Sequence, residues 1–241
     1  MSQDSRLENA LTNLVDGLSS AADTGCSVVL YGSAARGDWD NARSDVNLLV
    51  VIDDPSPEHL AKLTPAVTAW HDSGFTPPLL IGRHEWRHAT DVFPIELTDM
   101  QLAHRVLLGS DPLSGLVVSM ADLRRALESE LRGKLMRLRQ AYVRFHGQRP
   151  TLGGFAVASV SELLVLLRCS AVLLGRNPGL TADSVIDSLA TEIGTGADSI
   201  REVARHRRDN EWSCSTEMFA DYIEAIRRIS DLVDITPTGA S

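Results

Sequence analysis

The sequence predicts an α+β protein, with a mixed α/β domain over residues 1–115 and a helical bundle over residues 118–235. Short β-branched apolar runs occur only in the first half of the chain, where they alternate with segments of helical period. Beyond about residue 118 the apolar side chains recur at helical spacing, and no convincing strand remains. A length of 241 residues suits one large domain or two small ones.

The first half begins with an expected amphipathic helix over 4–23, because Leu7, Leu11 and their neighbours fall on one face. Two strands are expected at 26–31 (CSVVLY) and 46–52 (VNLLVVI), each bounded by turn residues. The elements expected after them are a helix over 56–73, a strand over 79–81, a helical turn over 85–89, a strand over 93–97 and a sheet extension over 105–108.

The second half is expected to hold helices with breaks at Pro150 and Pro178. Its most apolar stretch, 155–174, contains Glu162 and Arg168, and a charge at the centre of a bilayer costs about 2.5–3.5 kcal/mol. We therefore expect a buried helix of a soluble protein and no membrane partner. The expected helices cover 119–146, 155–175, 182–193, 199–209 and 216–234.

Charge and cysteine content narrow the class of protein. The chain has 23 Lys and Arg against 32 Asp and Glu, a formal net charge of −9, which argues against broad nucleic-acid binding. Cys26, Cys169 and Cys214 are isolated, as is typical of reduced thiols in the cytosol. The polar segment 1–13 does not resemble a signal peptide, so a cytoplasmic protein is expected. The sequence is compatible with a homodimer.

The chemically informative stretch is LYGS at 30–33, followed after a polar loop by DVNLL at 45–49. Gly32 lets a phosphate approach the backbone closely, and Ser33 adds an N–H and a hydroxyl donor. Positions 45 and 47 leave a strand on the same face. Oxygen donors there could hold Mg²⁺ together with substrate phosphates.

These residues resemble the nucleotidyltransferase superfamily of the DNA polymerase β type. The motif of that superfamily is a hydrophobic residue, Gly, then Gly or Ser, about ten residues, and Asp-x-Asp or Asp-x-Glu in a strand, with a third carboxylate on a later strand. LYGS…SDVNLLVV fits this pattern, and Glu96 in FPIEL fits the third position. The resemblance covers roughly residues 25–110 and implies a polymerase-β-like mixed sheet with flanking helices. The later helices are similar in kind to the bundles of antibiotic nucleotidyltransferases.

The resemblance also implies the site. Gly32 and Ser33 would cradle the triphosphate, and Asp45 and Glu96 would be the catalytic metal ligands. The chemistry would be a two-metal transfer of a nucleotidyl group from an NTP, with ATP as the expected nucleotide, to a hydroxyl of a small molecule or a protein. From the loop between the two strands, Arg36 and Arg43 could also reach the triphosphate, although loop arginines are usually solvated.

Asn47 departs from the pattern, because position 47 should carry a carboxylate. Its amide oxygen can still bind a cation but brings no negative charge. The sequence also resembles bacterial nucleotidyltransferase-domain proteins with Asp-x-Asn at this place, and Asp38 or Asp40 in the loop could compensate. Two hypotheses follow: an active nucleotidyltransferase, or a catalytically degenerate nucleotide-binding or interaction protein of the same fold.

Three weaker patterns remain. His84 and His88 in HEWRH have HExxH spacing, but the segment is short and a zinc site there is disfavoured. Arg201 and His206 (or Arg139 and His146) fit the loose Arg–His spacing of helical HEPN ribonucleases, which chance also explains. The segment 124–149 carries eight basic residues, which could bind a phosphate-bearing substrate but more often form a solvated, paired face. They are Arg124, Arg125, Arg132, Lys134, Arg137, Arg139, Arg144 and Arg149.

Overall fold

A computed structural model describes residues 3–21, 25–37, 46–209 and 211–238. Contacts divide the chain into two compact units. The sheet unit comprises Met1–Phe93 and Met100–Val117, and the helical unit comprises Pro94–Asp99 and Val118–Ser241. The short segment Pro94–Asp99 thus packs with helices that follow it by more than twenty residues, instead of with the sheet unit that surrounds it in the sequence.

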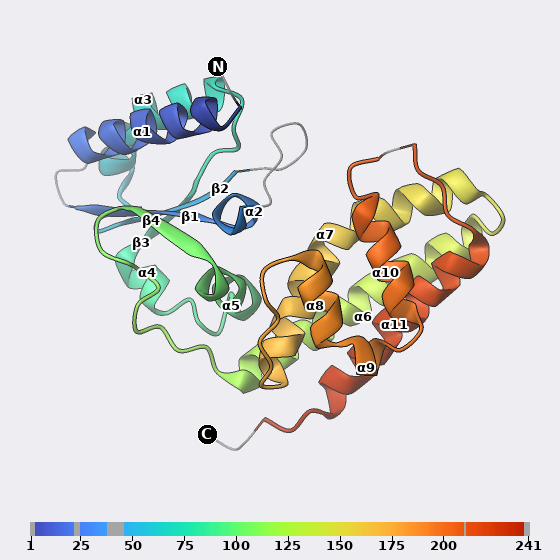
Figure 1. The fold of residues 1–241 in the computed structure, drawn as a ribbon. Helices are drawn as coiled ribbons and strands as arrows, with labels where there is room; N and C mark the ends of the chain where they lie inside the picture. Colours follow the sequence, from blue (N-terminus) through green and yellow to red (C-terminus); the bar gives the residue numbers. More distant parts are fainter. Residues whose placement is uncertain (1–2, 22–24, 38–45, 210, 239–241) are drawn as a thin grey trace. The chain divides into compact units, whose positions relative to one another are not determined.

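The sheet unit is built on a mixed four-stranded sheet in the order β3-β2-β1-β4 (Figure 1). β1 (Cys26–Tyr31) pairs antiparallel with β2 (Asn47–Ile52) and with β4 (His104–Leu108). β3 (Leu79–Gly82) pairs parallel with β2 through the crossover helix α3 (Pro57–Asp72). The expected strands over 26–31, 46–52, 79–81 and 105–108 are confirmed, within a residue or two at their ends.

One face of the sheet is covered by α1 (Gln3–Ala21) and α3 (Figure 1). Alternate residues of β1 and β2 point into this layer, among them Val28, Leu30, Leu48 and Val50, and they form one core with leucines of α1. Strand side chains alternate between faces, so Tyr31 and Asn47 leave the sheet on the face opposite α1 and α3. The short helices of this unit are α2 (Ser33–Arg36) and α4 (Arg83–Arg87).

The expected strand over 93–97 is wrong: this segment enters α5 (Pro94–Leu102). Pro94 occupies the first helical turn, where its fixed φ and missing N–H fit a helix start. The Thr98 hydroxyl donates to the carbonyl of Pro94 at 2.7 Å. Ile95, Leu97 and Met100 are all buried, so apolar residues lie on more than one side of the helix and mimic the alternation of a strand.

The helical unit packs its long helices α6 (Met120–Arg144), α7 (Arg149–Leu173) and α11 (Thr216–Ile235) against one another (Figure 1). The shorter helices α8 (Ala182–Ser188), α9 (Ala190–Ile193) and α10 (Gly196–Arg205) complete it. The bundle predicted from the helical spacing is confirmed, with 182–193 divided between α8 and α9.

Helix α7 is the one described helix whose length and apolar composition would allow it to cross a membrane. Two thirds of its most apolar window is buried inside the protein. Its Arg168 is 3% exposed and its Nε–H donates to the Asp99 carboxylate at 2.6 Å. A buried arginine that is paired with a carboxylate is consistent with α7 being a core helix of the bundle.

Candidate functional site

The sheet unit brings Gly32, Ser33 and Asn47 to one end of β1 and β2. Tyr31 pairs with Asn47 across the two strands, and Gly32 follows directly as the residue that caps α2. Gly32 has φ 74° and ψ −150°, a conformation that is essentially restricted to glycine. The backbone N–H of Arg36 donates to the Gly32 carbonyl at 3.1 Å, which closes the turn.

Asn47 lies directly against this glycine. A β-carbon at Gly32 would lie 2.7 Å from Asn47 Nδ2, closer than real side chains approach. Gly32 and the side-chain amide of Asn47 are therefore neighbours at the ends of β1 and β2. Any larger residue at position 32 would displace this amide. The Gly-Ser turn and the Asp-x-Asn strand thus meet at this point, while the roles of Gly32 and Asn47 in binding phosphate and metal stay predictions.

The remaining predicted residues fall into three groups. Ser33 and Arg36, on α2, are half-buried. Asp45 and Arg43, with the loop acids Asp38 and Asp40, lie outside the described residues. Glu96 lies on an exposed face of α5 and belongs to the helical unit, so its predicted strand position is wrong, while its role as a ligand stays a prediction.

Sequence reasoning missed His104, which is the first residue of β4. Tyr31 pairs with Asn47 on one side and with His104 on the other, so these three residues form one row across three strands. Paired residues of a sheet share a face, which puts His104 beside the predicted site. Its Nδ1 lies 3.0 Å from the Met100 carbonyl and its Nε2 lies 3.3 Å from Asp111 Oδ2. Only the pairing of β4 reveals this position, because the sequence around it contains no motif.

HEWRH has a structural role. Glu85 Oε2 accepts the backbone N–H of Gly82 at 2.8 Å, which caps the start of α4. His88 Nδ1 lies 2.8 Å from the carbonyl of His84, and the indole of Trp86 donates to the carbonyl of Pro112 at 2.8 Å. Among the described residues, no group of three His, Cys, Asp or Glu side chains could hold a metal ion.

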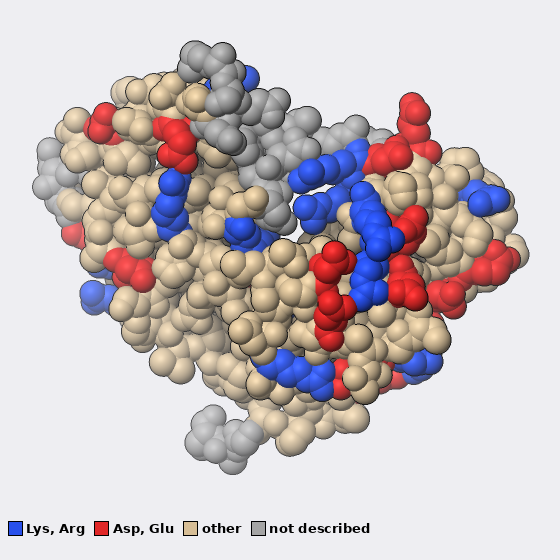
Figure 2. All heavy atoms as spheres, viewed as in Figure 1, with Lys and Arg blue, Asp and Glu red and all other residues tan. Residues whose placement is uncertain are grey.

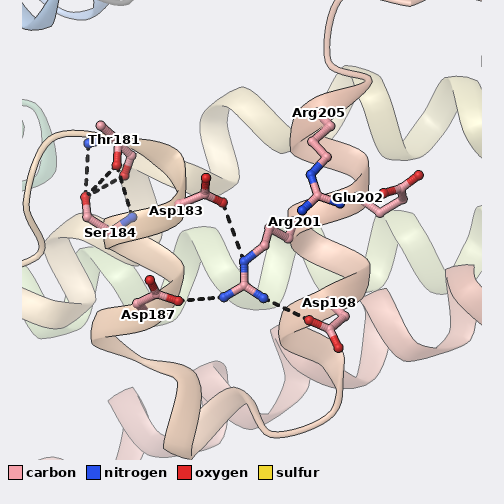
Figure 3. Close-up of polar contacts among 8 residues, drawn as sticks. All are labelled: Thr181, Asp183, Ser184, Asp187, Asp198, Arg201, Glu202 and Arg205. Carbon is pink, nitrogen blue, oxygen red and sulfur yellow. Dashed lines mark hydrogen bonds and ion pairs between the residues drawn. The ribbon is translucent and has the colours of Figure 1, made fainter.

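Arg201, singled out for its spacing to His206, instead joins two helices (Figure 3). Its guanidinium donates to Asp187 of α8 at 2.6 Å and to Asp198 of α10 at 2.8 Å, and it lies 3.5 Å from Asp183. His206 Nε2 lies 3.2 Å from Glu202. Arg201 therefore connects α8 to α10 through its contacts with aspartates on both helices.

Comparisons with known proteins agree with this geometry. Residues 11–108 match the sequence model of a nucleotidyltransferase domain, a span that contains all four strands. The chain therefore carries a nucleotidyltransferase domain over residues 11–108.

A solved structure shares this fold over most of its length: the spectinomycin adenyltransferase AAD(9) from Enterococcus faecialis, determined with ATP and spectinomycin. The TM-score is 0.55 at 12% sequence identity, and the alignment covers 92% of this chain and 98% of that one. No curated protein sequence matches the chain. The structural likeness thus extends through the helical unit, although at this identity it speaks for the fold alone.

Proposed function

We propose that the sheet unit binds a magnesium nucleoside triphosphate, ATP in the first instance, and that the chain transfers its nucleotidyl group to a hydroxyl of a small molecule or a protein. The observation that carries this proposal is the contact between Gly32 and Asn47 at the paired ends of β1 and β2. The nucleotidyltransferase domain supports it, and the adenyltransferase with a similar fold was determined with ATP and a small-molecule acceptor.

The backbone at Gly32 and Ser33 would bind the phosphates. A glycine with positive φ leaves its Cα open to a phosphate oxygen, and the N–H and hydroxyl of Ser33 are donors. Arg36, on α2, and Arg43 would add charge-assisted hydrogen bonds to the phosphates.

The donor set at this site fits one divalent cation better than two. Asp45 and Asn47 would hold it, since a carboxylate and an amide oxygen leave coordination positions for phosphate oxygens. When bound, Mg²⁺ would offset phosphate charge and polarise the phosphorus–oxygen bonds. Glu96 is the candidate third ligand.

In the transfer, the acceptor hydroxyl oxygen forms a bond to the α-phosphorus while the bond from that phosphorus to the pyrophosphate oxygen breaks. The hydroxyl proton passes to a carboxylate or to water, and Glu96 is the candidate acceptor. Pyrophosphate leaves with the electron pair of the broken bond.

The second candidate function is nucleotide binding without turnover, and Asn47 is the observation that favours it. An amide in place of a carboxylate removes a negative charge from a site that the superfamily uses for two ions. A loss of about 3–5 kcal/mol of transition-state stabilisation would lower the rate about 10²–10⁴-fold.

Two measurements test these proposals. Mg-ATP should raise the melting temperature of the wild type, and Asp45→Ala should abolish that rise while Asp53→Ala, at the far end of β2, retains it. A rise that survives Asp45→Ala would mean that the nucleotide binds elsewhere. Pyrophosphate release across a panel of acceptors should increase in Asn47→Asp. Absence of release from both forms would favour the binding protein.

A further inference from the structure

The stretch from the middle of α6 to the first half of α7 contains no acidic residue. Residues 131–161 hold six Lys and Arg but no Asp or Glu, in a chain that has 32 of these acids. Two of the six cations find carboxylates outside the stretch: Arg132 lies 3.0 Å from Asp234, and Lys134 lies 2.8 Å from Glu162. On the face of the helical unit in Figure 2, blue and red side chains likewise lie next to one another.

The last turns of α6 differ from this pattern. Arg137, Arg139 and Arg144 are exposed, and among the described residues none of them has a carboxylate partner. The Phe145 ring orders Arg144 instead, with its centre 5.0 Å from the guanidinium carbon. An aromatic ring meets a guanidinium through its π-face and does not occupy the N–H donors as a carboxylate would. The end of α6 therefore carries positive charge that no described acid of the chain pairs with.

Two apolar side chains lie on the same exposed face of α6. Met136 is 59% exposed and Val143 is 80% exposed. They are seven residues apart, which is two helical turns, so they lie on one side of the helix. Arg139 flanks this pair on one side, and Arg137 and Arg144 flank it on the other. Apolar residues at a spacing of seven with charged residues at the margins are typical of a helix face that packs against another helix.

We propose that this face of α6 binds an amphipathic helix of a partner protein, with apolar side chains against Met136 and Val143 and acidic side chains against the three arginines. Aspartate or glutamate on the partner would supply the carboxylates that α6 lacks, and a guanidinium binds a carboxylate through two parallel hydrogen bonds. Arg and Met are also enriched at protein interfaces. All of these residues belong to the helical unit, so the interaction does not depend on how a nucleotide is bound or transferred.

The apolar pair distinguishes a protein partner from other anionic partners. The phosphate backbone of a nucleic acid would pair with the arginines but would leave Met136 and Val143 without apolar contacts. A membrane surface would require a wider apolar face than two side chains provide. The net charge of −9 does not prevent an acidic helix from binding, because salt screens charges beyond about 8 Å at physiological ionic strength.

The test is fluorescence anisotropy of the full chain with a labelled peptide of about three heptads, which has Leu on one face and Glu on both flanks. Arg139→Gln/Arg144→Gln should raise the Kd of this peptide at least fivefold, and Met136→Ser/Val143→Ser at least threefold. The matched variant Arg227→Gln/Arg228→Gln removes the same charge from α11, where Glu224 already pairs with both arginines, and should change the Kd less than twofold. All of these substitutions are at the surface, and the melting temperature of each variant checks that it folds.

Four results would overturn the proposal. The first is no binding of the Glu peptide, and the second is equal binding of a peptide with Lys in place of Glu. The third is equal weakening by the two arginine double variants. The fourth is tighter binding of a uridine oligonucleotide or of phosphatidylglycerol vesicles through the same arginines, which would assign this face to nucleic acid or to a membrane.

Discussion

The sheet unit and the helical unit handle polar groups in opposite ways. Among the described residues, the buried charged side chains are Asp99, Lys134 and Arg168, and all three belong to the helical unit. In the sheet unit the buried core is apolar apart from Ser27 of β1, and Asn47, Tyr31 and His104 form a polar row at the ends of strands. Backbone conformation and register thus organise the candidate site of one unit, and charge pairing organises the packing of the other.

The largest effect should come from the buried pair of the helical unit. Asp99→Ala should lower the free energy of unfolding by about 3–5 kcal/mol, because Arg168 would keep a buried charge without its carboxylate. Replacing both, as Asp99→Leu/Arg168→Met, should cost far less. Urea denaturation measures both. Equal losses in the single and double variants would show that the pair itself does not carry the effect.

The next effect tests the backbone of the sheet unit. Gly32→Ala should cost about 1–3 kcal/mol through its backbone conformation and should also displace the Asn47 amide. Gly37→Ala is the matched control, since Gly37 also has positive φ (81°) but a β-carbon added there would meet nothing within 4 Å. Thermal shift with Mg-ATP should separate them: only the Gly32 variant should lose nucleotide binding. If both variants bind equally well, contact with Asn47 has no role in the site.

A smaller effect is expected at Arg201, where three exposed aspartates surround one guanidinium (Figure 3). Arg201→Met should cost about 1 kcal/mol or less, because surface ion pairs are screened by solvent. The loss should shrink further at high salt. A cost that stays constant between low and high salt would show that packing of the arginine stem, and not its charge, joins α8 to α10.

The smallest effect concerns pH. Hydrogen bonds from Arg227, then Arg228, lower the pKa of Glu224 from 4.5 to about 2. A lowered pKa in the folded state means that the contribution is present above pH 4.5 and is lost as the pH falls toward 2. Glu224→Gln should therefore flatten the acid limb of the melting-temperature profile in that window and change little at pH 7. An unchanged acid limb would contradict this.

Structural features that depend on neighbouring residues could be predicted from the sequence, whereas features that depend on distant residues could not. The strands of the sheet unit follow from local composition and turn residues, so they could be predicted, whereas the contact between Gly32 and Asn47 depends on the pairing of β1 with β2. The helix at Glu96 could not, because Ile95, Leu97 and Met100 are buried on several sides and hide the helical period.

Long-range partners were also beyond the sequence. Arg168 and Asp99 are 69 residues apart, and many other acids could have served as the partner. The position of His104 beside Tyr31 depends on which strand β4 joins, which no single segment specifies.

The packing of Pro94–Asp99 with the later helices bears on how such a chain can recombine. A chimaera of two related proteins that is joined at residues 116–117 would take α5 from one parent and α7 from the other. Arg168 of one parent would then face position 99 of the other parent, whose side chain need not match it. Only exchanges that carry Asp99 and Arg168 together preserve the match. The helical unit is therefore not one continuous stretch of the chain: it includes the short segment Pro94–Asp99, which precedes β4.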